Sequence, residues 1–321
     1  MNILHLSDTP LSGSPYKLMK IQQKTGHNSR LINARVKYSE YSGIEYPKDI
    51  LLQLDKKTKS PMYDKDEIFY LFESADVIHC HNRYRDQFIF RYYPELANFL
   101  SSKKTALQFH SDRSSLKKVN INIKDHTLDV SLVVAQYQVR HFPESIPVPN
   151  AIDIYDPIYM PTKNRSSKHI VYSPSNTVLR GWNNKGHQFI EKSLRLLGRK
   201  ATYDIITNTP HLECIKRKQQ GSIAIDEIIT GSYHLCTLEG LSHGQVVFCD
   251  LDTRTIDAVS KVSNSPLPVI NADKKNFKTL LNELLEDEEK ILELGKKSRD
   301  FMEENWNPDI INKKYEEAYK V

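Results

Sequence analysis

The chain has 321 residues, of which 39% are hydrophobic and 26% are charged, and its formal net charge is +5. This composition is that of an ordinary globular protein, and the length suits two domains that each bury their own core. No apolar run reaches the roughly 20 residues that span a membrane, and no basic signal-peptide flank precedes the first strand. We therefore expect a cytoplasmic protein without an integral membrane segment.

The basic excess lies in the first half of the chain. Residues 1–155 hold 21 of the 45 Lys and Arg but only 17 of the 40 Asp and Glu. So mild an excess is typical of a solvated surface, although it also suits an anionic acceptor such as nucleic acid or a phosphorylated glycan. The four cysteines form no Cys-x-x-Cys pair, which indicates reduced core residues and not a disulfide framework.

The first predicted strand covers residues 2–8, and the loop after it opens a helix at about Pro15. Ser14 before a proline is a helix-start signal. Gly13 is the one glycine of this loop, so the Gly-x-Gly-x-x-Gly fingerprint of dinucleotide-binding folds is absent. By itself the loop is typical of a plain turn, at the edge where open α/β sheets place ligands.

Histidines mark two further strands of the first half. Further strands are predicted at 29–33, 75–81, 104–110 and 131–135, with a helix at 64–74. Alternation places His79 and His81 on one face of their strand, as metal ligands require, but no third ligand is evident, so we predict no metal site. His110 ends the strand 104–110, where catalytic groups gather; the alternative is a hydrogen-bonded surface histidine.

A linker composition at 156–168 separates the first half from a second strand–helix series. The strand at 169–172 leads into a loop that carries Arg180 and Lys185 just ahead of a helix at 187–197. Two cations at a helix N-terminus predict a diphosphate cradle, whereas the alternative is a solvated basic loop. Further strands are predicted at 203–207, 223–226 and 246–249, and further helices at 210–220, 273–286, 288–305 and 308–320.

The stretch 231–250 predicts a short helix followed by an apolar strand. We expect Glu239 near the start of this helix and Gly244 at its left-handed end. A carboxylate beside a phosphate site accepts hydrogen bonds from a ribose diol, and the alternative is a glutamate that only stabilises the helix dipole. The two strand–helix series predict an α/β protein with two Rossmann-like domains.

Residues 239–247, EGLSHGQVV, resemble the second half of the Glu-x7-Glu signature of retaining GT-B glycosyltransferases of family 4. Residues 146–153 are similar to the family's IPNGVD segment, and Arg180 with Lys185 has the spacing of its phosphate-binding pair. The resemblance covers most of the chain and is strongest from 173 to 250. Gly231 occupies the position of the first Glu, so the usual contact to the donor sugar is missing.

The resemblance implies a GT-B fold whose two domains face each other across a cleft. Residues 1–155 form the acceptor side, residues 156–307 bind the nucleotide sugar, and the helix at 308–320 returns to the first domain. Glu239 then contacts the ribose, His110 the donor sugar, and Arg180 with Lys185 the leaving diphosphate. The other donor-binding candidates are Gly13, Ser14, Ser175, Asn176, Gly240 and Leu241. No metal or cofactor is implied besides the nucleotide-diphosphate sugar.

We therefore predict a retaining glycosyltransferase that moves a sugar from a nucleotide-diphosphate sugar to a hydroxyl of a cell-surface or lipid-linked glycan. In that family the leaving phosphate takes the acceptor proton, so no protein base is named. Three alternatives stay open: a glycosyltransferase of hydroxymethylated pyrimidines in phage DNA, a nucleotide-sugar 2-epimerase or hydrolase, and a non-catalytic homologue that has lost activity with the first Glu. The sequence indicates no oligomeric state.

Overall fold

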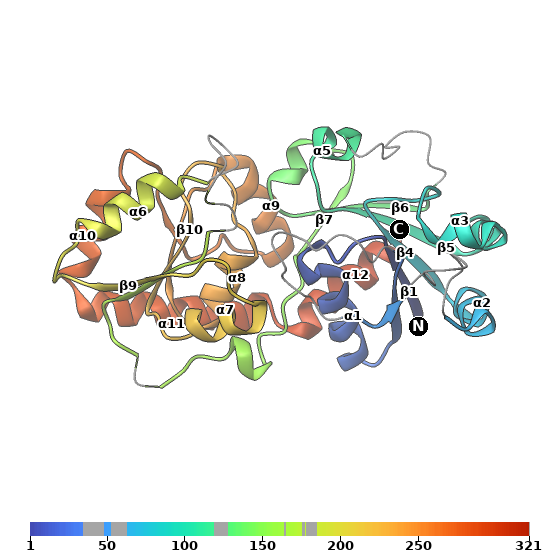
Figure 1. Ribbon diagram of the computed structural model, residues 1–321, viewed down its shortest axis with the longest axis horizontal. Helices are drawn as coiled ribbons and strands as arrows, with labels where there is room; N and C mark the ends of the chain where they lie inside the picture. Colours follow the sequence, from blue (N-terminus) through green and yellow to red (C-terminus); the bar gives the residue numbers. More distant parts are fainter. Residues whose placement is uncertain are drawn as a thin grey trace. The chain divides into compact units, whose positions relative to one another are not determined.

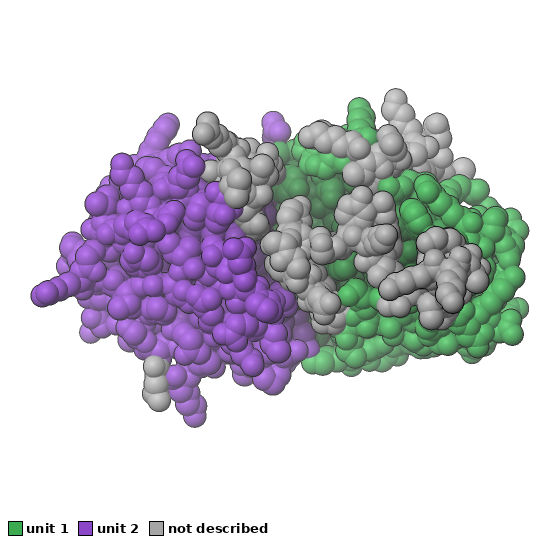
Figure 2. Space-filling view, in the orientation of Figure 1, with its two compact units in different colours: residues 1–151, 308–321 green, residues 152–307 purple. Residues whose placement is uncertain are grey.

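The computed structural model describes residues 1–34, 48–52, 63–118, 128–163, 165–174, 177 and 185–320. The chain divides into two compact units (Figure 2). Unit 1 comprises residues 1–151 and 308–321, and unit 2 comprises residues 152–307. Within the described residues, no helix combines the length and the apolar character needed to cross a lipid bilayer.

Unit 1 is built on a parallel sheet of seven strands in the order β3-β2-β1-β4-β5-β6-β7. The strands are β1 (Asn2–Ser7), β2 (Asn28–Asn33), β3 (Ile50–Leu51), β4 (Val77–His81), β5 (Lys104–Phe109), β6 (Val130–Val134) and β7 (Ile146–Val148). The chain runs outward from β1 to β3 and then returns to the other side of β1. The topological switch point, where such sheets bind ligands, therefore lies at the carboxyl ends of β1 and β4.

The helices of unit 1 are α1 (Ser14–Lys24), α2 (Lys65–Ser74), α3 (Ile89–Tyr92), α4 (Phe99–Ser102), α5 (Arg113–Lys118) and α12 (Pro308–Tyr319). Gly13 caps α1, and Pro15 follows in its first turn, as the sequence predicts. The side chain of Asp64 caps α2 by accepting the N–H of Asp66. Helix α12 packs beside α1 (Figure 1), so the predicted return of the last helix to the first half of the chain is confirmed.

The sheet of unit 1 has two unlike faces because side chains alternate along each strand. One face, the apolar face, belongs to a hydrophobic core that also includes α2, and its central residues are Leu4, Leu6, Ile78, Cys80, Leu107 and Phe109. The opposite face, here called the histidine face, carries His5, His79, His81 and Gln108. Side chains of α1 and α12 hydrogen-bond to these residues, so these two helices cover the histidine face.

Unit 2 is built on a parallel sheet of five strands in the order β12-β11-β10-β8-β9. The strands are β8 (His169–Tyr172), β9 (Thr202–Ile205), β10 (Ile223–Glu227), β11 (Val246–Cys249) and β12 (Ile270–Asn271). The helices are α6 (His187–Arg195), α7 (His211–Lys218), α8 (Leu235–Ser242), α9 (Thr253–Ser263), α10 (Phe277–Leu285) and α11 (Glu288–Asn305). Here the switch point lies between β8 and β10.

Helix α9 is the longest element that the sequence patterns did not predict. It begins after Asp252, whose carboxylate accepts the N–H of Thr255, and it ends at Asn264 in a left-handed conformation. Both are ordinary helix-end signals. Predicted strands and helices elsewhere in unit 2 are present, and Gly244, with φ of 65°, follows α8 as the expected left-handed residue.

Candidate functional site

Strained backbone gathers at the carboxyl edges of the two sheets. The residues there with positive φ are Leu11, Ser12 and Gly13 after β1, Asn82 after β4, Lys185 and Gly186 before α6, Asn208 after β9 and Gly231 after β10. A side chain in the left-handed region costs about 1–2 kcal/mol, and such strain is typical of ligand-binding loops that the surrounding structure holds in place. Each unit therefore offers a candidate site at its own switch point.

In unit 2, Lys185 is held against the end of β10. Lys185 and Gly186 have φ of 54° and 84°, and the carbonyl of Lys185 accepts the N–H of Ile228 at 3.3 Å. A Cβ atom on Gly186 would lie 2.5 Å from Cγ1 of Ile228, so only glycine allows this approach. The turn places a lysine just before the first turn of α6, whose free N–H groups favour an anion.

Asp226, near the end of β10, connects this strand to α8. Its buried carboxylate accepts the N–H of His234 at 2.7 Å and the hydroxyl of Thr237 at 2.6 Å. Burial alone raises the pKa of a carboxyl group, but His234, Thr237 and the positive charge of Lys185 hold the pKa of Asp226 well below its usual range. A fixed negative charge therefore stands beside Lys185 and the N-terminus of α8.

Glu227 shapes the loop that follows β10. It is fully buried, and its Oε2 accepts the N–H groups of Ile229 at 2.9 Å and Thr230 at 2.6 Å. Burial and the neighbouring Asp226 raise the pKa of Glu227 to about 8. At neutral pH this side chain is therefore mostly protonated, unlike the carboxylate next to it.

The predicted position of Glu239 in its helix is wrong. Glu239 is the fifth of the eight residues of α8, because Asp226 receives the N–H of His234 and the helix begins directly afterwards. Its carboxylate pairs with the ammonium of Lys218 in α7, and the two side chains are 5% and 3% exposed. Burial lowers the pKa of Lys218, but Cys236 and Glu239 beside it raise the pKa well above the usual value, so the pair is ionic.

The other predicted residues of this stretch serve packing. Leu241 is fully buried, and a Cβ on the buried Gly240 would lie 2.9 Å from Cγ2 of Val247, so α8 packs closely on the sheet at this point. Gly231 has φ of 66°, and its N–H donates to Asp250 at 2.9 Å. A glutamate at position 231 would be strained, which gives a backbone reason for the missing first Glu.

In unit 1, the loop after β1 forms the start of α1. Gly13 has φ of 76°, and its N–H donates to the carbonyl of Pro10 at 2.9 Å. The hydroxyl of Ser14 is buried and donates to Oδ1 of Asn150 at 3.0 Å. The structure thus places both predicted residues at the switch point of unit 1, with the Ser14 side chain joined to the loop after β7.

His110 lies at the end of β5 with its backbone fixed on both sides. Its N–H donates to Oδ1 of Asn82 at 2.7 Å, and its carbonyl accepts from Nε2 of Gln138 at 2.8 Å. The ring is half-buried, and burial lowers its pKa to about 3, so the imidazole is neutral. Its Nε2 lies 2.9 Å from Nδ1 of His81, which connects the predicted site residue to the histidine face.

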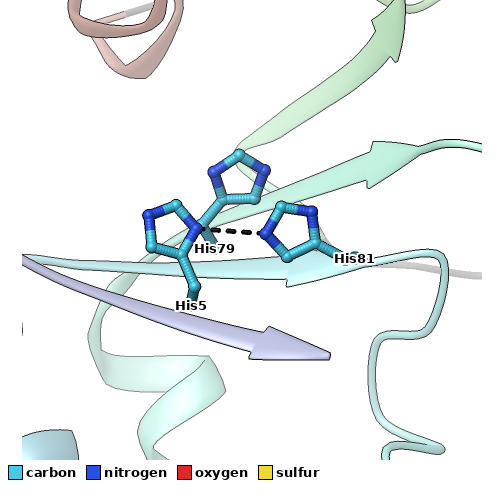
Figure 3. A group of neighbouring side chains, drawn as sticks. All are labelled: His5, His79 and His81. Atoms are coloured by element: carbon cyan, nitrogen blue, oxygen red, sulfur yellow. Dashed lines mark hydrogen bonds between the residues drawn. The ribbon is translucent and has the colours of Figure 1, made fainter. Parts of the chain in front are cut away.

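His79 and His81 have a third possible metal ligand nearby, contrary to the sequence prediction. Among the described residues, His5 of β1 joins them, and the three offer nitrogen atoms within 4.8 Å of one another (Figure 3). Both nitrogens of His5 and both of His81 already take part in hydrogen bonds, with Gln22, with His110 and with each other. The nitrogens of His5 and His81 thus serve as hydrogen-bond donors and acceptors here, and the absence of a metal site stays a prediction.

Known proteins resemble this chain in structure. No family model and no curated protein matches it. An alpha-glucosyltransferase in complex with UDP and a 13-mer DNA is 12% identical, with a TM-score of 0.68 and 99% of both chains covered. Anabaena Alr3699/HepE in complex with UDP is 12% identical, with a TM-score of 0.62 and full coverage of both chains. S. aureus TarM in complex with UDP is 9% identical, with a TM-score of 0.61 and the same coverage.

The chain has the GT-B fold. The predicted fold class is therefore confirmed. Of the predicted site residues of this GT-B chain, Ser175, Asn176 and Arg180 lie outside the described residues. The roles predicted for His110, Lys185 and Glu239 stay predictions.

Sequence reasoning missed several buried partners in this GT-B chain. Asp226 could have been predicted from its place at a strand end, because carboxylates there meet the loops that bind ligands. Lys218 gave no signal, since a lysine that ends a helix is ordinarily exposed. His5 could have been found from the strand order, because β1 and β4 are neighbours and His5 pairs in register with His79.

Proposed function

We propose that the protein is a glycosyltransferase that moves a sugar from a nucleotide-diphosphate sugar to a hydroxyl acceptor. The observation that carries the proposal is Lys185, held in a left-handed turn between the end of β10 and the first turn of α6. A cation and a helix N-terminus at a switch point suit a diphosphate. The compared GT-B proteins that contain UDP support a nucleotide in this role.

The proposed step follows from charge. The bond between the sugar carbon C1 and the diphosphate oxygen breaks, a bond from the acceptor oxygen to C1 forms, and the acceptor proton passes to the leaving diphosphate. Lys185 and the N–H groups of α6 stabilise the negative charge that develops, an effect worth about 3 kcal/mol for one well-placed donor. Retention of configuration and membership of family 4 belong to this proposal and rest on the sequence resemblance.

Other residues complete the proposed site. His110 contacts the donor sugar, Arg180 adds a second cation, and Glu239 accepts a hydrogen bond from the ribose. The ion pair with Lys218 holds the Glu239 carboxylate, the acceptor in this contact, in place. No metal or cofactor is part of the proposal.

A glycan is the proposed acceptor, and modified DNA is a second candidate. DNA is favoured by one observation, that an alpha-glucosyltransferase of similar fold was solved with a DNA 13-mer. The basic excess of residues 1–155 is compatible with either acceptor. Binding of duplex DNA that weakens steeply with salt would select the second candidate.

The test is a donor screen that measures release of nucleotide diphosphate, with glycans and hydroxymethylated DNA as acceptors. Lys185→Gln should lower kcat by about 100-fold, the usual loss for one such electrostatic donor. Lys192→Gln removes the same charge from the exposed side of α6 and serves as the matched control, with unchanged kcat. Equal rates in the two variants would contradict the role of Lys185.

The same screen separates the alternatives. Turnover of the nucleotide sugar without any acceptor would indicate an epimerase or a hydrolase. Tight binding of the nucleotide without release of product from any donor would indicate a non-catalytic homologue. Either result would overturn the proposed transfer reaction.

A further inference from the structure

A line of hydrogen bonds runs from His110 into the interior of unit 1. Nε2 of His110 lies 2.9 Å from Nδ1 of His81, and Nε2 of His81 lies 3.1 Å from Nδ1 of His5 (Figure 3). Nε2 of His5 then lies 2.7 Å from Oε1 of Gln22 in α1. We call these four residues the histidine chain. Its three inner members are at most 1% exposed, so water does not compete for these bonds.

The contacts of Gln22 give the histidine chain a direction. Nε2 of Gln22 donates to the hydroxyl of Tyr319 at 3.2 Å, and the hydroxyl of Ser29 donates to Oε1 at 2.8 Å. The structure places Oε1 of this amide toward His5 and its Nε2 toward Tyr319. An amide oxygen only accepts hydrogen bonds, so the hydrogen between the two residues belongs to Nε2 of His5.

The direction passes along the chain because a neutral imidazole has a single N–H. With its hydrogen on Nε2, His5 accepts at Nδ1, and the donor there is Nε2 of His81. His81 in turn accepts at Nδ1 from Nε2 of His110. Neutral rings are consistent with the burial that lowers the pKa of His5 to about 4 and that of His110 to about 3.

His79 belongs to a side branch. The Tyr319 hydroxyl accepts from Gln22 and lies 2.7 Å from Nδ1 of His79. Nε2 of His79 is also buried. A metal shared by His5, His79 and His81 would have to displace the bond between His5 and His81 and reverse the order of donors.

We propose that Gln22, acting through His5 and His81, holds His110 as the neutral Nε2–H tautomer, so that Nδ1 of His110 accepts a hydrogen bond from a hydroxyl of the bound sugar. Gln22, His5 and His81 are positioning residues in this proposal. The tautomer follows from the contacts alone, whereas its use toward a sugar rests on the proposed function. Within the described residues, no hydrogen bond reaches Nδ1 of His110.

The first test is nitrogen NMR of histidine-labelled protein without substrate. His110 should show its hydrogen on Nε2 in the wild type, and Gln22→Leu should give a mixture of tautomers. Gln22→Glu keeps an acceptor oxygen and should restore the single tautomer. The matched control is Gln108→Leu, which removes a 3.0 Å bond to Tyr315 on the same face and should leave His110 unchanged.

Three results would overturn the tautomer assignment. The first is a hydrogen on Nδ1 of His110 in the wild type. The second is an unchanged tautomer in folded Gln22→Leu. The third is a stoichiometric metal on His5 and His81 in the purified protein, because the bond between them would then be absent.

The second test concerns the sugar. If Nδ1 of His110 accepts a hydrogen bond, a nucleotide sugar with a hydroxyl at the contacted position should be preferred over the same nucleotide sugar with fluorine there. Fluorine supplies no hydrogen for this bond. We expect a preference of about tenfold in the wild type, the value of one hydrogen bond, and a reduced preference in Gln22→Leu. Lack of any preference in the wild type would contradict the sugar contact. If no donor reacts at all, the proposed function fails while the NMR result still decides the tautomer.

Discussion

The two units bury different kinds of polar group. Under the sheet of unit 1, the buried groups are neutral imidazoles joined in a line, with pKa values lowered by burial. In unit 2, Glu239 and Lys218 form a buried ion pair, and Asp226 carries a fixed negative charge near Lys185. Both networks lie beside a switch point of a parallel sheet.

The difference teaches what each network can do. A line of neutral hydrogen-bond donors and acceptors has a direction, so a change of donor at one end alters the hydrogen bonds at the other end. A buried ion pair has no such direction, but it holds charge at a fixed place and is very sensitive to the loss of one partner. We therefore connect unit 1 with the choice of a tautomer and unit 2 with the binding of a charged ligand.

The largest predicted effect is the loss of the buried ammonium in unit 2. Lys218→Met should lower the free energy of unfolding by about 3–5 kcal/mol, because Glu239 would remain as an uncompensated buried charge. Chemical denaturation measures this loss. Lys218→Met combined with Glu239→Leu should recover most of the stability, since an apolar pair of similar size is well tolerated.

An exposed pair supplies the control for this prediction. Lys296 and Asp300 lie one turn apart on α11 with exposed side chains, and Lys296→Met should leave stability unchanged within error. A loss of stability as large as that of Lys218→Met would show that burial is not the cause. If the double variant were no more stable than Lys218→Met, the interaction of the two charges would not explain the effect.

The next prediction is an opposite response to acid of two buried groups, His5 in unit 1 and Glu227 in unit 2. The pKa of His5 falls from 6.5 to about 4 on folding, so the unfolded chain binds more protons and stability is lost as the pH falls below 6.5. The pKa of Glu227 rises from 4.5 to about 8, so its contribution is complete below pH 4.5 and is lost as the pH rises through 8. The contribution of His5 to stability should therefore fall in acid while that of Glu227 grows. In unit 2, His243 opposes this gain, because burial lowers its pKa to about 4.

Hydrogen exchange at pH 8 and pH 5 measures this contrast strand by strand. The lowered pKa of His5 should by itself remove about 2 kcal/mol of protection from β1 and β4 at pH 5, whereas the contribution of Glu227 to the protection of β10 should grow. His5→Gln should reduce the loss in unit 1, and Glu227→Gln should remove the gain in unit 2. If His5→Gln and Glu227→Gln changed the pH response of their strands in the same direction, the contrast would be refuted.

The smallest predicted effect concerns the glycine that replaces the first Glu of the family signature. Gly231→Ala should lower the free energy of unfolding by about 1 kcal/mol, because the backbone there is left-handed. Gly198→Ala is the matched control, with φ of 60° at an exposed turn after α6. It should cost a similar amount of stability without any effect on turnover, whereas Gly231→Ala should also lower turnover.

A gain of activity in Gly231→Glu would contradict the backbone explanation for the missing glutamate. Calorimetry on the three variants, together with the donor screen, separates the contribution to stability from that to activity. Equal turnover in Gly231→Ala and the wild type would show that this loop takes no part in the reaction.

The sequence predicted those features that depend on local patterns. Apolar runs located the strands, and the basic loop located Lys185, because both signals lie within a few residues of the chain. The pairing of Glu239 with Lys218 depends on how α7 meets α8, and the position of Glu239 in its helix depends on Asp226, 13 residues earlier. Such contacts follow from the packing of elements and produce no periodic pattern in the sequence.

The histidine chain could be predicted from the sequence only in part. Alternation placed His79 and His81 on one face, which is correct, but the partner in β1 required the order of the strands. The direction of the histidine chain required still more, namely the placement of the Gln22 amide, which two side-chain contacts hold. Those contacts come from β2 and from a helix almost 300 residues away, so no reading of neighbouring residues could supply them.

Helix α12 has a consequence for how the protein is made. Tyr315 and Tyr319 reach Gln108 and His79 from a segment that the ribosome adds after every residue of unit 2. During synthesis, unit 2 is therefore complete as a sequence while the histidine face still lacks one of its two covering helices. Residues 308–320 thus complete a domain whose other elements all precede unit 2 in the chain.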